Sequence, residues 1–433
     1  MSEITIGIIG LIVLLIMFLT GMEMAFLMAA IGFIGIWVLG GFQTAVGMLA
    51  NDFMDALASY GLTAIPLFIF MGQIAFNAGI AKKLYDSAHK FLGHIPGGLA
   101  VATVVGATIF KAICGSVAAT SATFASVAIP EMDRFQYSKK LSTGIVATVG
   151  TLGVLLPPST ILIIFGIITN QSIGKLFLAG IMPGLIMAIF FMVIIFGWSR
   201  INPNIGPKSD KFPMKERIKT LPSIIGPIVI FLLIIGGLMK GIFTPTEAGA
   251  VGAFAVLLLC MFRKEFGLKG LKKSIEESVR TTCMVLMLVA SSNILGHFVA
   301  LSNISQATAQ WVAELNIHRA LIVIVIFLIY LIGGSFMDDL AFMILATPIF
   351  FPIITNLGYD PLWAGIMIGL TVCVGSVIPP VAMCVFIVKN ITKTPIGIIY
   401  SGVYPFLISM IIVVILLFLF PELATYLPSV LMK

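Results

Sequence analysis

The stretch GSVAATS at residues 115–121 interrupts a long apolar run with a turn and a row of small hydroxyl side chains. A second stretch, GSFMDD at 334–339, interrupts the second half of the chain in the same way, here with two adjacent acids. About forty residues after each stretch, a proline pair falls inside another apolar run, at 157–158 and at 379–380. Because proline removes a backbone donor and breaks a helix, the sequence predicts two pairs of interrupted elements.

The composition places these interruptions in a membrane. Of 433 residues, 60% are hydrophobic and 10% are charged, which excludes a soluble globular domain. Many apolar stretches contain 17–25 residues, enough to cross a hydrocarbon core of ~30 Å as a helix. Alternating ten-residue strands, the signature of a membrane barrel, do not occur. The predicted fold class is therefore an all-α polytopic membrane protein.

The landmarks of the first half recur in the second half at a nearly constant offset. The Gly-Ser pairs lie 219 residues apart, the proline pairs 222, and the motifs GIMP at 180–183 and GVYP at 402–405 also 222. This order predicts two repeats, 1–198 and 221–433, joined by a basic connector at 199–220. Each repeat is expected to hold a re-entrant hairpin, at 96–132 and 318–356, and a broken helix, at 141–169 and 361–388.

The charges predict how the repeats are oriented. Five full crossings in each repeat, an odd number, would turn the second copy upside down. The segments then facing the cytoplasm hold 20 of the 25 Lys and Arg residues, as the positive-inside rule requires. They are 81–95, 131–140, 198–220, 263–280 and 389–393. Both termini are expected outside. This distribution explains the net charge of +7 without a nucleic-acid partner.

Two polar stretches and the remaining loops complete this topology. Residues 80–94 alternate apolar and charged positions at helical spacing, which predicts an amphipathic helix in the inner interface. Residues 303–317 are the corresponding stretch on the outside, and 41–60 is expected to be an outside loop. No HExxH, Walker A or GxSxG pattern indicates a metalloprotease, a nucleotide hydrolase or a serine hydrolase. The protein is therefore not expected to be an enzyme or to hold a cofactor.

The broken elements offer ligands for a cation. Backbone amides and carbonyls cannot be left without hydrogen-bond or ion partners in lipid. A helix break at mid-membrane depth therefore needs a group or an ion that binds the exposed backbone. Proline cannot donate to the carbonyl four residues earlier, which frees the carbonyls of Gly153 and Gly375. Carbonyls together with Ser and Thr hydroxyls suit a hard cation. We expect one Na⁺ site in each half, between hairpin tip and broken helix. The alternative is that these small residues only pack helices together.

A charged residue at bilayer depth raises the insertion free energy by ~2.5–3.5 kcal/mol, so such residues are expected to have a structural or functional role. Asp338 and Asp339 begin a predicted helix, where they cap it or, for Asp338 above all, help to hold a cation. Because these acids repel an anion, a substrate is expected nearer the first tip or between the tips. Lys111 meets a substrate carboxylate, snorkels or pairs with an acid. Glu23 and Glu247 are interpreted as helix caps.

Five runs of the sequence carry a resemblance to a known family. They are CGSVAATSATFASVAIPEM, GTLGVLLPPSTILIIFGIITNQSIGKLFLAGIMPG, FTPTEAGAVGA, GGSFMDDLAFMILATPIFFPI and VGSVIPPVAMCVFIVKN. Together they resemble the large membrane subunit of tripartite ATP-independent periplasmic (TRAP) transporters, and the similarity extends from Glu23 to Pro405. The resemblance implies an elevator-type, Na⁺-coupled importer of organic acids, such as C4-dicarboxylates or sialic acid, in the bacterial inner membrane. It also implies two partners, a small four-helix membrane subunit, expected as a separate chain, and a periplasmic substrate-binding protein.

The resemblance further implies site residues in both halves. One Na⁺ is expected at Gly115, Ser116, Gly153 and Leu156. The other is expected at Gly334, Ser335, Asp338, Gly375 and Ile378. Substrate groups are expected near Ser116, Thr120, Ser121, Ser159 and Ser335, with Lys111 as a further candidate.

Two other functions stay open. A self-sufficient sodium/dicarboxylate or citrate carrier has similar inverted hairpins and needs no partner chain. A channel would use the hairpin tips as a selectivity filter. A membrane-embedded enzyme lacks a nucleophile or metal constellation in this sequence.

Overall fold

The computed structural model describes residues 2–261, 266–304, 306–308, 310 and 317–432. Its first half comprises helices α1 (Glu3–Phe18), α2 (Met24–Gly40), α3 (Phe42–Ala58), η1 (Gly61–Thr63), α4 (Ala64–Asn77), α5 (Ile80–Leu92), α6 (Gly98–Lys111), α7 (Val117–Arg134), α8 (Lys139–Val149), α9 (Leu152–Leu155), α10 (Thr160–Ile168) and α11 (Ile173–Ile201). The second half comprises α12 (Met214–Met239), α13 (Pro245–Met261), α14 (Leu268–Leu301), α16 (Arg319–Phe336), α17 (Asp339–Asn356), α18 (Pro361–Gly375), α19 (Met383–Thr392), α20 (Ile396–Leu419) and α21 (Glu422–Leu431).

The predicted all-α membrane fold is confirmed. Seven helical segments among the described residues are long and apolar enough to cross a membrane, and α3 with η1–α4, bent by 55°, makes an eighth if it is one span. The segment Lys139–Ile168, which contains α8, α9 and α10, counts as one of the seven. Helices α1, α2 and α13 are apolar but have only 16 or 17 residues. The predicted number of five crossings in each half therefore stays a prediction.

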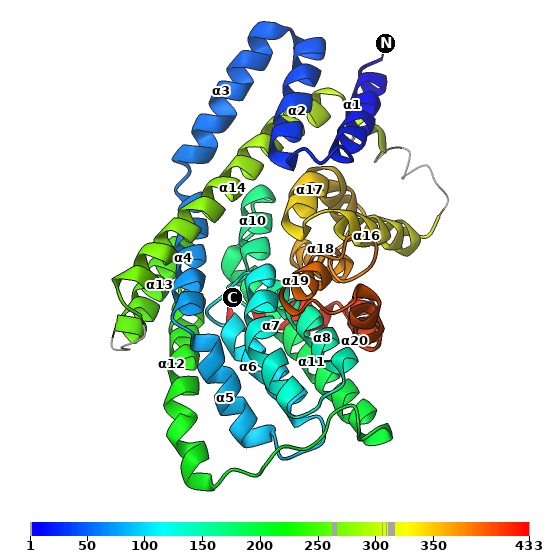
Figure 1. Cartoon of the computed structure of the whole chain (residues 1–433). Coiled ribbons are helices and arrows are strands. Elements are labelled where there is room, and N and C mark those ends of the chain that lie inside the picture. The colour runs from blue at the N-terminus through cyan, green and yellow to red at the C-terminus, as the bar shows by residue number, and fades with distance from the viewer. Residues whose placement is uncertain (1, 262–265, 305, 309, 311–316, 433) are drawn as a thin grey trace.

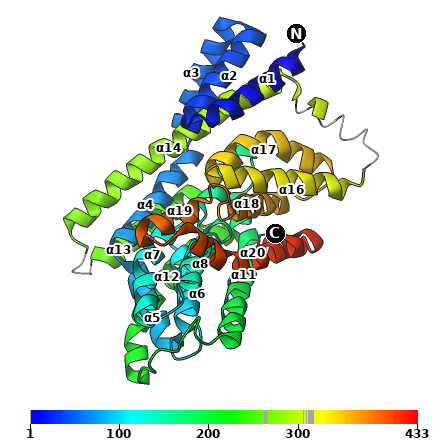
Figure 2. The same ribbon diagram turned by 45° about the vertical axis from the view of Figure 1, so that its right-hand side comes forward.

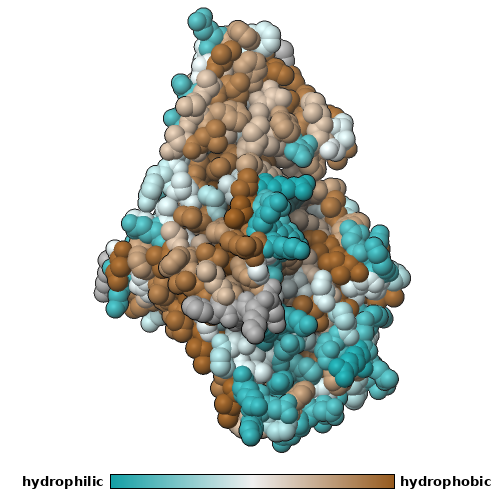
Figure 3. Space-filling model, turned by 60° about the vertical axis from the view of Figure 1, so that its left-hand side comes forward, coloured by the Kyte–Doolittle hydropathy of each residue, from teal (hydrophilic) through white to brown (hydrophobic). Residues whose placement is uncertain are grey.

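The helices form two groups (Figures 1 and 2). The long helix α14 packs against α2, α3 and α4, and α4 packs in turn against α13. The hairpins and broken helices of both halves lie beside this group, where α16, α17, α18 and α19 pack near α7, α8 and α10. Hydrophilic side chains gather at the lower end of the molecule, where Figure 1 places α5 and the beginning of α12 (Figure 3).

The amphipathic helix predicted at 80–94 is confirmed as α5. Its apolar positions Ile80, Leu84 and Ala88 are buried, whereas Lys82 and Asp86 are exposed. His89 at its end bonds Ser209 Oγ through Nε2 at 3.0 Å. This bond ties α5 to the segment between α11 and α12. Most of the corresponding outer stretch, 303–317, lies outside the described residues.

Three segments expected between the membrane helices are partly or wholly helical. Residues 42–58 form α3, in which Asp52 is buried and pairs with His297 of α14 (Oδ1 to Nε2, 3.0 Å). The basic segment at 263–280, expected to face the cytoplasm, contains the beginning of α14. There Lys272 with Glu276 and Lys273 with Glu277 form exposed ion pairs at i,i+4 spacing, which favours helix. The connector expected at 199–220 shrinks because α11 continues to residue 201 and α12 begins at residue 214.

The two hairpins turn at different places relative to their Gly-Ser pairs. The first breaks as predicted: α7 begins after Ser116, whose Oγ accepts from Ala119 N at 3.2 Å. In the second, α16 continues through Gly334 and Ser335 to residue 336, so the break falls at 337–338, within the predicted stretch 334–339 but after its Gly-Ser pair. Asp338 decides the position instead, because its Oδ1 caps α17 by accepting from the amides of residues 340 and 341 at 3.1 and 3.3 Å.

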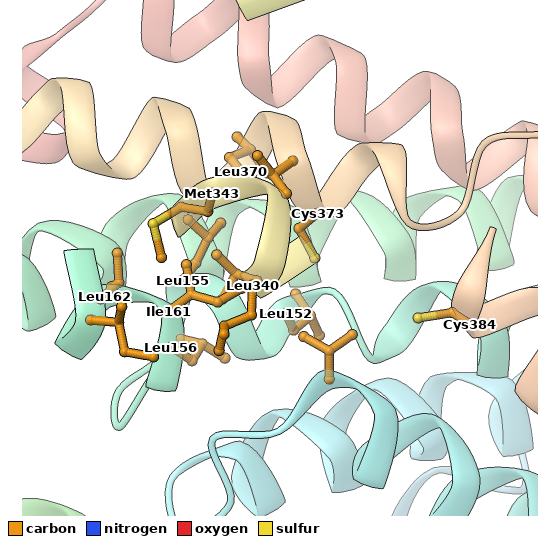
Figure 4. Close-up of a cluster of buried hydrophobic side chains, with 14 of the residues drawn as sticks. Leu152, Leu155, Leu156, Ile161, Leu162, Leu340, Met343, Leu370, Cys373 and Cys384 are labelled. Atoms are coloured by element: carbon orange, nitrogen blue, oxygen red, sulfur yellow. The ribbon is translucent and has the colours of Figure 1, made fainter. Parts of the chain in front are cut away.

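Both broken helices are interrupted at their proline pairs, and the peptide bonds Pro157-Pro158 and Pro379-Pro380 are cis. The first broken helix packs against the second half of the chain (Figure 4). Side chains of α9 and α10, among them Leu155 and Leu162, meet Met343 of α17 and Leu370 of α18. The Sγ atom of Cys373 lies 3.7 Å from the carbonyl oxygen of residue 151. The interrupted elements of the two halves therefore share one core.

Candidate functional site

A cavity of about 320 Å³ lies where the hairpins and broken helices of both halves meet. The first hairpin contributes residues 114–119, the first broken helix Thr160, the second hairpin residues 338–340 and the second broken helix Met383. The opposite wall comes from α4 and α14, including Gln73 and Thr281. Segments separated by more than 200 residues are therefore brought to one place.

Four helices begin at this cavity. Val117 begins α7, Thr160 begins α10, Asp339 begins α17 and Met383 begins α19, and all four residues line the space. The N-terminus of a helix carries unpaired amides and a partial positive charge, so it attracts anions. At α17 the Asp338 carboxylate already supplies a negative group. The beginnings of α7, α10 and α19 line the same cavity.

The first hairpin tip is organised around the carbonyl of Ser116. It accepts hydrogen bonds from Lys111 Nζ at 2.7 Å and from Thr120 Oγ1 at 2.9 Å. Of the residues predicted to bind substrate, Ser116 lines the cavity. Thr120, Ser121 and Ser159 are fully buried beside it, and Ser159 caps α10 through its Oγ. Thr160, the next residue along the chain, lies on the cavity wall instead.

The first tip packs directly on the first broken helix. A Cβ atom at Gly115 would lie 2.7 Å from the carbonyl oxygen of Pro158, so only glycine allows this approach. A Cβ atom at Gly153 would overlap the Nζ atom of Lys111. Lys111 is fully buried, although a lysine at bilayer depth is costly. Its hydrogen bond to the Ser116 carbonyl turns the Lys111 side chain toward the tip. Of the roles predicted for Lys111, snorkelling toward an interface therefore does not fit.

The second tip packs on the second broken helix through bare backbone. A Cβ atom at Gly334 would overlap the carbonyl oxygen of Val372, and one at Gly375 would lie 2.5 Å from that of Leu331. The amide of Val381 donates to the Ser335 carbonyl at 3.1 Å, which connects the break to the hairpin. The structure therefore brings Gly334, Ser335 and Gly375 together. Ile378 joins them through its amide, which donates to the Gly375 carbonyl at 3.0 Å.

The two adjacent acids have different surroundings. One oxygen of Asp338, Oδ1, caps α17, as the capping interpretation predicts, and the side chain is partly exposed to the cavity. Asp339 is buried, and its Oδ1 accepts from the amide of Leu340 at 2.9 Å. Its Oδ2 has no hydrogen-bond partner among the described residues. Asp339 is thus the acid with an unused oxygen beside the cavity, which the sequence did not indicate.

Glu23 and Glu247, the two residues interpreted as helix caps, also differ in their hydrogen bonds. Glu247 Oε2 accepts from both the amide and the hydroxyl of Thr244, at 2.8 and 2.9 Å, and so caps α13. Glu23 stands at the N-cap position of α2 but makes no side-chain capping bond.

Four cavity residues were not predicted from the sequence: Thr160, Met383, Gln73 and Thr281. Nothing in their local sequence shows that they face a common space.

Comparisons with known proteins show which family and which fold the chain resembles. The family model described as "Tripartite ATP-independent periplasmic transporter, DctM component" matches residues 11–423. The C4-dicarboxylate TRAP transporter large permease protein DctM of Pseudomonas aeruginosa is 33% identical, covering 89% of this chain and 90% of that protein. The sialic acid TRAP transporter large permease protein SiaM of Vibrio cholerae is 29% identical, covering 89% of this chain and 90% of that protein. In fold, the chain resembles MtrF of Neisseria gonorrhoeae, with a TM-score of 0.60 at 14% identity over 97% of this chain and 95% of that one.

The fold and the cavity between the hairpins define a polytopic membrane protein with interrupted helices. The match over nearly the whole chain is more specific, and the chain belongs to the DctM component family of tripartite ATP-independent periplasmic transporters. It is the large membrane subunit of such a transporter and a multi-pass protein of the inner membrane. The resemblance drawn from the five sequence runs is thereby confirmed.

Proposed function

We propose that this subunit imports an organic acid, of the C4-dicarboxylate or sialic acid class, bound in the cavity between the two hairpin tips. The observation that carries the proposal is the meeting of four helix N-termini at one cavity of about 320 Å³. Three of them, at α7, α10 and α19, offer amides and positive dipole ends to a carboxylate. The Ser116 and Thr160 hydroxyls add neutral donors. The substrates for which two of the relatives are named, C4-dicarboxylate and sialic acid, are acids of this kind.

Sodium coupling is proposed for the second half of the chain. Gly334, Ser335, Gly375 and Ile378 lie together, and Asp338 follows at the beginning of α17. Carbonyl, hydroxyl and carboxylate oxygens are the ligands a hard cation takes. Ion binding there would hold α16 against the broken helix and so order the tip beside the cavity. In the first half, Ser116 and Gly153 contact Lys111, so the proposal does not extend to Gly115, Ser116, Gly153 and Leu156.

The proposed movement is an elevator. The hairpins and broken helices of both halves would move together, because they share one core. Helices α1 to α4 and α12 to α14 would stay fixed with a small four-helix membrane subunit. The cavity lies at the border between these groups, with Gln73 of α4 and Thr281 of α14 on the fixed side. A periplasmic binding protein would deliver the acid, and both termini are proposed to be periplasmic.

Counterflow into proteoliposomes tests this proposal. The large and small subunits are reconstituted with a panel of radiolabelled dicarboxylates and sialic acid, with and without Na⁺ and the binding protein. We expect uptake of one class that needs both. Uptake without any binding protein would indicate the self-sufficient carrier. A substrate flux far larger than a fixed ratio to the Na⁺ flux allows would indicate a channel.

A further inference from the structure

The ammonium group of Lys111 lies between the first hairpin tip and the first broken helix. Its Nζ atom donates a 2.7 Å hydrogen bond to the Ser116 carbonyl at the tip. On the other side it lies against the Gly153 backbone, where any Cβ atom would overlap it. The side chain has no exposed surface. A cation thus already touches both elements that a Na⁺ ion of the first half would have to join.

At the matching position of the second half, the described structure has no cation. Tyr330 lies four residues before Gly334, as Lys111 lies four residues before Gly115. Tyr330 is also fully buried, but its hydroxyl is neutral and pairs with Thr347 Oγ1 on α17 at 3.5 Å. The two halves therefore place a charged and an uncharged side chain at the same position relative to their tips.

The other hairpin brings a buried acid, Asp339, to the cavity that the first tip also lines. Its Oδ2 is buried without a hydrogen-bond partner among the described residues. A buried carboxylate needs a compensating charge nearby. The Lys111 ammonium, bonded to the Ser116 carbonyl at the first tip, is a positive group at the position where a bound ion would otherwise lie.

We infer that Lys111 is a built-in cation that takes the place of a coupling ion in the first half. Each large subunit then binds one Na⁺, in its second half, and not two. This inference rests on the proposed sodium coupling. A covalently attached ammonium keeps the first tip joined to its broken helix in every state of the transport cycle. Only the second tip is then ordered by Na⁺, so the two tips respond differently to the ion.

Direct counting of bound ions tests the inference without knowledge of the substrate. The complex of large and small subunits is placed in lipid nanodiscs, and saturating ²²Na⁺ binding is measured by scintillation proximity, with choline keeping the ionic strength constant. The wild-type complex is expected to bind one ion for each large subunit. Lys111→Ala is expected to bind two, because the Ser116 carbonyl and the space beside Gly153 become free.

Lys140→Ala is the matched control, because it removes the same charge from an exposed position at the beginning of α8 and should still bind one ion. Two ions in the wild type would overturn the inference and leave the proposed coupling intact, and so would a single ion in Lys111→Ala. No bound ion in any variant would contradict sodium coupling itself. If Lys111→Ala does not assemble, the wild-type count alone decides between one ion and two.

Discussion

Close backbone packing between α16 and α18 predicts that Gly375→Ala destabilises the protein. The new Cβ atom would lie 2.5 Å from the Leu331 carbonyl oxygen, 2.7 Å from Gly334 C and 2.8 Å from Ser335 N. All three are backbone atoms, so no change of rotamer relieves the overlap. To reach an ordinary contact of 3.4 Å, the two helices must move about 0.9 Å apart.

Overpacking a well-packed interior costs about 1–3 kcal/mol. We expect Gly375→Ala to lie at the upper end, at about 3 kcal/mol, because a whole helix has to move. The free energy of unfolding is compared through thermal unfolding of the purified subunit in detergent. Gly236→Ala in α12 is the control, because nothing lies within 4 Å of its new Cβ atom. Alanine is favoured over glycine inside a helix by about 0.5–1 kcal/mol, so this control should unfold at the same temperature as the wild type or higher.

The same substitution should weaken sodium activation, since it displaces Ser335 from the second broken helix. If Gly375→Ala and Gly236→Ala unfold at the same temperature and keep the same sodium dependence, α16 and α18 are not packed as described. The assignment of the second sodium site to this contact would then be wrong as well.

Four other outcomes follow from the structure. Ser116→Phe should abolish uptake, because the ring would fill much of a cavity of about 320 Å³, whereas retained transport would mean that the ligand does not approach the tip. Asp338→Asn should weaken sodium activation more than it lowers the unfolding temperature, and unchanged activation would remove Asp338 from the ion site. Trp363→Phe should cost about 1–3 kcal/mol in unfolding free energy, because it loses a buried 2.8 Å hydrogen bond to the Leu417 carbonyl, and an unchanged unfolding temperature would contradict this. Burial lowers the pKa of His89 below its usual 6.5, so the unfolded chain binds a proton more readily than the folded one. Thermal stability should therefore fall as the pH drops below about 6.5. His89→Gln should make the unfolding temperature depend less on pH in this range.

Much of the membrane architecture could be predicted, because it depends on local patterns. The proline pairs and the Gly-Ser stretch at 115–121 gave the breaks of both broken helices and of the first hairpin. The amphipathic spacing at 80–94 gave α5. Contacts between distant residues carry no such local signal. Asp52 was assigned to a loop because its partner, His297, lies 245 residues further along the chain.

The candidate site was predictable in outline and not in detail. The convergence of the tips was expected from the doubled pattern, but the wall residues Thr160 and Met383 were not, since nothing in their local sequence shows that they face the same space. The role of Lys111 stayed open because its partner is a backbone carbonyl, which every residue has. The adjacent acids were ambiguous for a related reason: capping by Asp338 and the unused oxygen of Asp339 depend on where α17 begins.

The central claim is that the cavity between the tips binds the transported acid and is exposed to each side of the membrane in turn. Alkylation of Thr160→Cys, in a subunit whose five native cysteines have been replaced and which still transports, tests this most directly. The account predicts that a membrane-impermeant maleimide reaches position 160 from either side, and that a saturating transported acid blocks the labelling. Labelling from one side only, or labelling that the acid does not change, would contradict it.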